Sequence, residues 1–313
     1  MKLVGVAMVR NEADILEAFV RHNLAVLDRM LVVDHGSMDG TSQILASLVR
    51  EGLAVDAVRD DARGYPLQAT IVALTRRAFA DHAADFVVPL DSDEFLKVRS
   101  RAHLESALAA LPPTHHARME WLTYVPPFGA GTSTLTALRT ARRVAAERHG
   151  LTKVIVARSF ASQPAATIEL GAHNVHAPDP STLAPHVMFP PDAAASAHVP
   201  IRSARQHAAK TAIRWLAKLN SPPTAPGQSF QWKESFKYLR SGRPLTPHYL
   251  ATAAVNYSVP PDRWLPLDAI PLVGDPFLAD LDLRYGQYER ADPLALVLAF
   301  LEQLVAARAP AAR

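Results

Sequence analysis

Hydrophobic residues in the first hundred positions form short continuous runs that alternate with longer stretches of mixed apolar and polar residues. Continuous runs are typical of strands buried on both faces, and the mixed stretches repeat their apolar residues at the spacing of an amphipathic helix. Strands are predicted over 3–9, 30–33, 54–58 and 86–90, and helices over 12–27, 41–50 and 67–81. This alternation predicts a doubly wound α/β sheet, in which ligands bind beyond the carboxyl ends of the strands.

The pattern weakens after residue 100, where Pro, Ala and His become frequent and periodicity is harder to follow, most of all over 161–197. Helices are predicted over 101–111, 202–219 and 293–307, strands over 118–125 and 154–157, and a linker over 220–227. We therefore expect a main domain over 1–219, with halves 1–100 and 101–219. A helical or irregular C-terminal extension is expected over 220–313.

Cysteine is absent from the 313 residues, which excludes disulfides, thiolate metal sites and a cysteine nucleophile. Any metal must then bind carboxylates, histidines or backbone oxygens, so a hard cation or a His-rich site is favoured. The apolar run 3–9 is too short, and too soon followed by charge, for a signal peptide. Because no apolar stretch reaches about 18 residues, no membrane-spanning helix is predicted and a cytoplasmic location is expected.

Positive charge is concentrated in one segment, although the net charge of the chain is only +3. Residues 199–250 contain nine Lys and Arg against a single acid, Glu234. Such a segment suits an anionic partner, which is a diphosphate, an anionic membrane surface or a nucleic acid, and the alternative is a solvated helix face. Nucleic acid is the least favoured of these partners, because the segment lacks interleaved aromatic residues of a recognisable motif.

Two carboxylates follow the last predicted strand of the first half. Asp91 and Asp93 are two residues apart, so in an extended chain their side chains point to the same face. Carboxylates that converge in this way repel each other unless a cation lies between them. Mg²⁺ or Mn²⁺ bridging to phosphate oxygens is the natural cation, and the alternative is a polar turn with solvated acids.

Three motifs occur in chain order, each at the carboxyl end of a predicted strand. They are Val9-Arg10-Asn11-Glu12, Asp34-His35-Gly36-Ser37-Met38-Asp39-Gly40-Thr41 and Asp91-Ser92-Asp93-Glu94-Phe95. Together they resemble the family-2-like glycosyltransferases of the GT-A fold, in the branch with an Asp-x-Asp-Glu-Phe motif. The resemblance covers 1–100 well and 101–215 loosely. It implies a Rossmann-like mixed sheet flanked by helices and metal-dependent use of a nucleotide-diphosphate sugar.

The resemblance also implies roles for single residues. Asp34 would accept hydrogen bonds from the donor's nucleoside, and its alternative role is to close a turn. Asp91 and Asp93 would hold the metal, with Glu94 supporting them. Donor-nucleotide contacts are further expected from Val9, Asn11, Glu12, Gly36, Gln68, Asp91 and Ser92. The alternative for Gly36 is a purely conformational role. The alternative for Gln68 is a surface position without contact to the donor.

A later segment resembles a His-x-x-x-Arg-Ser-x-x-Gln element of the same branch. It places His198 as a metal ligand or phosphate contact, and Arg202 and Lys210 as phosphate partners, since neutral imidazole suits Mn²⁺. His173 belongs to a Gly-x-His element and is a second candidate. The chain has 13 His, so for each of them a bystander role is the alternative.

An inverting transfer also needs a carboxylate that deprotonates the acceptor hydroxyl. Glu169 and Asp192 are the base candidates, and Glu120 and Asp179 are also possible, because no spacing selects one of them. The aromatic stretch 119–129 is either an acceptor wall or core.

The leading hypothesis is transfer of a sugar from a UDP- or GDP-sugar to a glycan or lipid-linked acceptor. There are two alternatives. A sugar nucleotidyltransferase would need a Gly-rich loop after the first strand, and the motif at 9–12 has no glycine. A non-catalytic nucleotide- or glycan-binding protein of the same fold is the other alternative.

Overall fold

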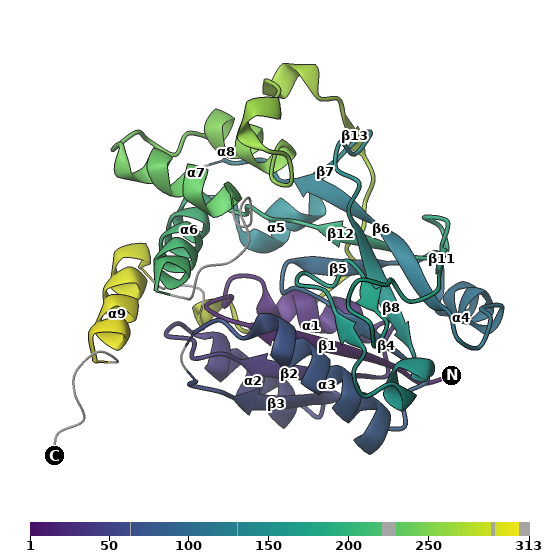
Figure 1. The fold of residues 1–313 in the computed structure, drawn as a ribbon. Helices are drawn as coiled ribbons and strands as arrows, with labels where there is room; N and C mark the ends of the chain where they lie inside the picture. Colours follow the sequence, from purple (N-terminus) through teal and green to yellow (C-terminus); the bar gives the residue numbers. More distant parts are fainter. Residues whose placement is uncertain (63, 130, 221–229, 289–291, 307–313) are drawn as a thin grey trace, which may run out of the picture.

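The computed structural model describes residues 1–62, 64–129, 131–220, 230–288 and 292–306. Its centre is a mixed sheet in the order β13-β7-β6-β8-β4-β1-β2-β3, with β5, β11 and β12 branching from this path (Figure 1). The strands of the first half are β1 (Leu3–Val9), β2 (Arg29–Asp34), β3 (Val55–Arg59) and β4 (Phe86–Pro89). They are mutually parallel, so their carboxyl ends meet at one edge of the sheet.

Helices cover both faces of this parallel part. They are α1 (Leu16–Leu24), α2 (Thr41–Arg50) and α3 (Leu67–Asp81). Alternate residues of β1 point to opposite faces, because Ala7 lies in the hydrophobic cluster of α1 and α2, and Val6 lies in that of α3. The helices predicted over 41–50 and 67–81 have the predicted bounds. Helix α1 begins four residues later than predicted, since the carbonyl of Glu12 closes a turn with the amides of Ile15 and Leu16.

The second half makes the sheet mixed. Strand β8 pairs antiparallel with β4, and β6 pairs antiparallel with β8. The strands of this half are β5 (Glu94–Lys97), β6 (His116–Val125), β7 (Arg142–Val144), β8 (Thr152–Ala157), β9 (Thr167–Ile168), β10 (Val175–His176), β11 (His186–Met188), β12 (Ala195–His198) and β13 (Leu272–Gly274). The predicted fold class, a mixed α/β sheet flanked by helices, is confirmed.

The remaining helices surround the carboxyl edge and the second half. They are α4 (Arg101–Ala109), α5 (Thr134–Arg139), α6 (Ala204–Leu219), α7 (Phe230–Arg240), α8 (Pro247–Val255) and α9 (Pro293–Ala306). Short 3-10 helices occur at Arg158–Ser162, Pro261–Arg263, Leu267–Ala269 and Gly286–Tyr288. Helices α6 and α9 lie side by side (Figure 1). Over the described ranges, no helix combines the length and the apolar character that crossing a membrane requires.

The C-terminal part packs against both halves of the main domain. Strand β13 pairs with β7, and the ring of Phe277 lies 5.1 Å from that of Phe95. The amides of Arg284 and Tyr285 donate hydrogen bonds to Glu17 of α1 at 2.8–3.0 Å. The boundary predicted at residue 219 stays a prediction, and the predicted linker lies outside the described residues except for Asn220.

The turn between β2 and α2 depends on a glycine for steric reasons. A Cβ atom added to Gly40 would lie 2.4 Å from the Cβ and 2.6 Å from the carbonyl oxygen of Tyr288. The backbone of Tyr288 cannot rotate away as a flexible side chain can. The C-terminal part would therefore have to move away from the turn.

We expect Gly40→Ala to lower the free energy of unfolding by about 1–3 kcal/mol, the usual cost of overpacking. Urea denaturation of wild type and variant measures the change. Gly150→Ala is the matched control, because nothing lies within 4 Å of the Cβ position of Gly150. Equal stability of the two variants would contradict the steric role of Gly40.

Candidate active site

The predicted site residues converge because β12 inserts between two other strands. Strand β12 pairs antiparallel with β5, so that His198 lies opposite Glu94, and parallel with β6, where His198 lies opposite Thr123. The amide of Val199 donates a hydrogen bond of 2.9 Å to the carbonyl of Asp93. The late histidine therefore reaches the acidic motif that follows β4, about a hundred residues earlier in the chain.

Helix α6 then brings two cations to the same place. Ser203 caps the helix by accepting a hydrogen bond from the amide of Gln206, so Arg202 stands just before its first turn. Lys210 follows Arg202 by eight residues, which is slightly more than two helical turns and thus the same side of the helix. Both side chains point toward the carboxyl ends of β1 and β4.

Asp93, Glu12, Asp14, Arg202 and Lys210 form one ion-pair cluster, the Asp93 cluster. The Lys210 Nζ lies 2.7 Å from Asp93 Oδ2 and 2.9 Å from Glu12 Oε1. Arg202 donates to Glu12 Oε2 at 2.6 Å and to both oxygens of Asp14 at 2.7 and 2.8 Å. The structure thus brings together the first motif, the third motif and the later basic segment. Arg202 and Lys210 pair here with carboxylates, and their contact with phosphates stays a prediction.

The charges of this cluster keep Asp93 ionised. Burial alone would raise the pKa of Asp93, but the positive charges of Lys210 and Arg202, together with His198, hold it well below its ordinary value. The pKa of Lys210 is raised in turn, because the charges of Asp93 and Glu12 outweigh the loss of solvent.

A second cluster, the Lys153 cluster, was not predicted. Lys153 of β8 is almost completely buried, and its Nζ lies 2.9 Å from Asp91 Oδ2, 2.6 Å from Glu94 Oε1 and 2.6 Å from the carbonyl of Gly171. Burial lowers the pKa of a lysine, but the charges of Asp91 and Glu94 raise that of Lys153 above its usual value. The available sequence signal was a single lysine inside an otherwise apolar strand, since a buried lysine requires carboxylate partners.

The two clusters hold more negative than positive charge. Their ion pairs join five carboxylates to three cations, namely Glu12, Asp14, Asp91, Asp93 and Glu94 with Lys153, Arg202 and Lys210. The excess is two negative charges when every carboxylate is ionised. In keeping with this excess, burial and the charge of Asp91 raise the pKa of Glu94 to about 8 despite the neighbouring Lys153.

Aromatic rings lie beside the acidic residues. The Trp121 ring is 4.4 Å from the His198 ring, 5.1 Å from that of His149 and 5.5 Å from that of His173, measured between centroids. Burial lowers the pKa of His198 to about 3, so its imidazole is neutral near pH 7. Trp121 is buried in the floor of the site, which corresponds to the core alternative of the sequence analysis for this residue.

The residues fit part of a site for a divalent metal. Among the described residues, no three His, Asp or Glu side chains gather as a complete set of ligands. The His198 Nε2 lies 3.7 Å from Asp93 Oδ1, whereas Lys210 engages Asp93 Oδ2 and Lys153 engages Asp91 Oδ2. Mg²⁺ and Mn²⁺ are commonly held by one or two carboxylates, with substrate phosphates and water filling the other positions. Asp93 and His198 are therefore the two predicted ligands that the structure brings close together, and metal binding by Asp91, Asp93 and His198 stays a prediction.

The first two motifs are tied to each other by a backbone turn. Asn11 has a φ of 55°, a left-handed conformation that asparagine tolerates, and its Oδ1 accepts a hydrogen bond of 2.7 Å from the amide of Met38. Asp34 is buried and accepts hydrogen bonds from the amide of Ser37 and the hydroxyl of Ser42. Its carboxylate thus closes the turn, which was the structural alternative for this residue.

Three smaller predictions fall in buried or conformational positions. Val9 is buried in β1 opposite Asp34, and Ser92 is buried between the two aspartates. Gly36 has a φ of 63°, so the turn uses its conformational freedom. None of these findings tests contact with a nucleotide, which stays a prediction for Val9, Gly36 and Ser92.

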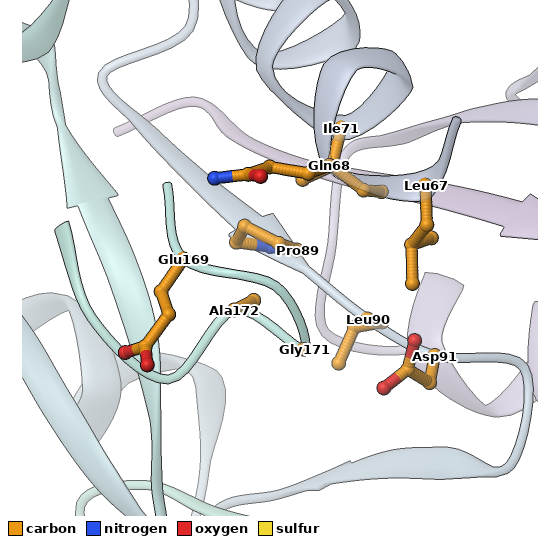
Figure 2. Close-up of a pocket in the computed structure, with 9 residues that line it drawn as sticks. All are labelled: Leu67, Gln68, Ile71, Pro89, Leu90, Asp91, Glu169, Gly171 and Ala172. Carbon is orange, nitrogen blue, oxygen red and sulfur yellow. The ribbon is translucent and has the colours of Figure 1, made fainter. Parts of the chain in front are cut away.

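Gln68, Asp91, Glu169 and Gly171 line a small pocket, with Asp91 and Glu169 at its opposite ends (Figure 2). Its volume is about 10 Å³, which is room for about one water molecule and none for a sugar nucleotide. Gln68 Nε2 donates a hydrogen bond of 2.8 Å to the carbonyl of Ile168. Gln68 therefore holds α3 to the loop that carries Glu169.

The two predicted bases lie in different places. Glu169 accepts a hydrogen bond from Asn174 and shares the pocket with Asp91. Asp192 is wrongly placed by the sequence analysis: it is 57% exposed, pairs with His103 at 3.3 Å and precedes β12, at the opposite end of that strand from His198. Sequence spacing gave no information on strand direction, which decides this point.

A further carboxylate near His198 was missed. Glu147 Oε2 lies 2.9 Å from His149 Nε2 and accepts a hydrogen bond from the hydroxyl of Thr123, the residue opposite His198. It belongs to an irregular loop after β7, where no periodicity or motif marks it.

The predicted basic segment divides into two groups. Arg202, Lys210 and Arg214 belong to the interior of the site, whereas α7 exposes Lys233, Lys237 and Arg240 at intervals of four and three residues. Arg202 and Lys210 of the inner group pair with buried carboxylates, whereas the outer group lies on an exposed helix face. Contact of either group with an anionic partner stays a prediction.

No family model matches the sequence, and no curated protein matches it. Similar solved structures include TarS 1-349 of S. aureus, at 14% identity and a TM-score of 0.38, covering 83% of this chain and 75% of that chain. Another is the mannosyltransferase PcManGT of Pyrobaculum calidifontis with GDP-Man and Mn²⁺, at 16% identity and a TM-score of 0.39, covering 98% and 88%. A third is glucosyl-3-phosphoglycerate synthase of Mycobacterium tuberculosis with Mn²⁺, UDP and glucosyl-3-phosphoglycerate, at 19% identity and a TM-score of 0.27, covering 38% and 44%. At these identities and TM-scores the similarity carries no conclusion about the activity of this chain.

Lys153→Met tests the Lys153 cluster. The change leaves the buried carboxylate of Glu94 beside Asp91 without a cation, so the free energy of unfolding should fall by about 3–5 kcal/mol. Urea denaturation at pH 7 measures it. The double variant Lys153→Met/Glu94→Gln should recover part of the loss, because it removes the uncompensated charge. A wild-type stability of Lys153→Met would show that Lys153 does not balance these acids.

Proposed function

We propose that this protein transfers a sugar from a nucleotide-diphosphate sugar to a hydroxyl acceptor with the help of a divalent cation. The observation that carries the proposal is the position of the acidic motif, in which Asp93 lies beside neutral His198 and buried lysines hold Asp91 and Asp93 in place. The motif lies at the carboxyl ends of parallel strands, where such sheets bind their ligands.

Asp91, Asp93 and His198 would hold the cation. When bound, it would neutralise the negative charge that develops on the diphosphate leaving group. Lys210 and Arg202 keep Asp93 and Glu12 in fixed positions through their ion pairs. Lys153 does the same for Asp91 and Glu94. Because the supporting cations are buried, the ligand oxygens are oriented before the donor arrives.

Glu169 is the base that we retain from the sequence analysis, because it shares a pocket with Asp91. Glu147 is the second carboxylate of this kind, on the side of His198 and Trp121. Deprotonation of the acceptor by either group, and inversion at the anomeric carbon, remain predictions. UDP- and GDP-sugars remain the expected donors, and a glycan or lipid-linked molecule the expected acceptor.

Peripheral contact with an anionic membrane surface stays a prediction, and the exposed Lys233, Lys237 and Arg240 of α7 are the residues that would make it. The two alternatives have less support. A nucleotidyltransferase needs a Gly-rich turn after the first strand, and here β1 is followed by Arg10, Asn11 and Glu12. A non-catalytic binding protein of the same fold is distinguished by nucleotide binding without sugar transfer.

Thermal unfolding with UDP, GDP, CDP or TDP, each in Mn²⁺ and in EDTA, tests the proposal. One nucleotide should raise the unfolding temperature in Mn²⁺ and do so less in EDTA, since a ligand at 100 times its Kd stabilises by about 2.7 kcal/mol. The absence of any shift with all four nucleotides would refute nucleotide-sugar use.

Asp93→Asn should abolish the Mn²⁺-dependent part of this shift and the transferase activity, because it removes a charged ligand. His198→Gln, which removes the neutral ligand, should weaken Mn²⁺ binding by about 10- to 100-fold, as measured by isothermal titration calorimetry with Mn²⁺. Asp81→Asn, an exposed aspartate of α3 paired with Arg77, is the matched control and should behave as wild type. Unchanged Mn²⁺ affinity in both site variants would remove these residues as ligands.

A further inference from the structure

Two arginines beside the site differ from its other buried cations. In the described part of the chain, Arg202, Lys210 and Lys153 each have a carboxylate within 2.9 Å. No carboxylate of the described residues lies within ion-pair distance of Arg10 or Arg214, and both side chains are partly removed from solvent. Partly buried charges without a counter-charge are costly unless a ligand supplies one.

Arg10 follows β1 directly and is held by the C-terminal helix. Its guanidinium lies 4.9 Å above the ring of Phe300 in α9 and donates a hydrogen bond of 3.1 Å to Gln303 Oε1. Its Nε is buried and has no hydrogen-bond partner among the described residues. Desolvation lowers the pKa of Arg10, and the charge of Asp34 offsets only part of this effect.

Arg214 is one helical turn after Lys210 on α6, so it continues the row of cations that begins at the Asp93 cluster. Its guanidinium stacks on the ring of Tyr65 at 4.0 Å, and its NH1 is buried without a partner in the described residues. Burial lowers the pKa of Arg214 to about 10, with Glu12 and Tyr257 opposing the change and Arg10 adding to it.

Both arginines border the carboxyl ends of β1 and β2. The charge of Asp34 acts on Arg10 and raises its pKa. Arg214 lies over the ring of Tyr65, and that ring is 6.5 Å from the ring of His35, the residue after Asp34. The two arginines thus lie beside the turn of the second motif, and Arg214 is one helical turn from Lys210, which pairs with Asp93. Unsatisfied N–H groups at this point suit the oxygens of a phosphate, to which arginine binds in a directional manner.

We propose that Arg10 and Arg214 form an anion site for phosphate groups, separate from the proposed metal ligands, and that Gln303 of α9 occupies Arg10 when no anion is bound. The proposal rests on the proposed function for its natural ligand, the diphosphate of the sugar donor. A free phosphate or pyrophosphate offers the same chemistry. A bound anion would replace the neutral hydrogen bond between Arg10 and Gln303 of α9 with a charged one.

Isothermal titration calorimetry in EDTA tests the pair without the metal. Wild type is titrated with pyrophosphate, with UDP and GDP, and with uridine and guanosine as ligands that lack phosphate. Arg10→Gln and Arg214→Gln should each weaken pyrophosphate and nucleoside diphosphate binding by about tenfold or more, since a charged hydrogen bond is lost. Nucleoside binding should stay unchanged. Arg77→Gln, an exposed arginine of α3, is the matched control.

A second readout separates ligand binding from a structural role. Removal of an unpaired buried charge should leave the unfolding temperature of the ligand-free protein unchanged or higher, and should reduce the increase produced by pyrophosphate. A variant that unfolds earlier yet binds pyrophosphate as wild type does would overturn the proposal. Gln303→Ala should strengthen pyrophosphate binding, and weaker binding would overturn the role of Gln303.

Failure of the two proposals can be told apart. If wild type binds UDP or GDP only through Mn²⁺ and the arginine variants bind them equally well, the anion site is refuted and the transferase proposal stands. If no nucleotide binds in Mn²⁺ but pyrophosphate binding depends on the arginines, the transferase proposal is refuted and the anion site stands.

Discussion

Compensation of buried charge is the constraint on which the arrangement of this protein depends. Asp93 and Glu12 end different strands of the parallel sheet, and both are removed from water. Lys210 bridges them from α6, so the helix has one position in which all three charges are satisfied. The same requirement places β8 beside β4, because Lys153 must reach Asp91 and Glu94. The two halves of the sheet are thereby locked to each other at the acidic motif.

The site contains cations of two kinds, and they have different consequences. Lys153, Arg202 and Lys210 pair with carboxylates and act on the orientation of acidic side chains. Arg10 and Arg214 lack such partners in the described residues and keep their hydrogen-bonding capacity for a ligand. A row of positive residues along one segment therefore does not have one function. The role of each positive residue depends on whether an acidic side chain lies beside it, and amino-acid composition does not show this.

Periodicity was sufficient for the first half of the chain and insufficient for the second. Helix α3 and strand β1 have their predicted bounds because local apolar spacing determines them. Strand β12 is Ala195–His198, with small residues and no alternation, and its position comes from pairing with β5 and β6. The motifs placed Asp93 and His198 in one site, and the structure has their side chains 3.7 Å apart. The base candidate Asp192 lies away from this site, because it precedes β12 whereas His198 ends that strand. Lys153 was missed because its partners are distant in sequence.

The return of the C-terminal part to the first half has a consequence for the order of folding. The amide of Tyr285 donates a hydrogen bond to Glu17, and the ring of Phe277 packs against that of Phe95. Glu17 and Phe95 both belong to the first hundred residues. These contacts span most of the chain, and closing such long loops is slow. During synthesis the acidic motif and its strands emerge long before the segment that covers them. Until that segment arrives, the first half exposes apolar residues such as Phe95 that it later covers, and exposed apolar surface favours aggregation.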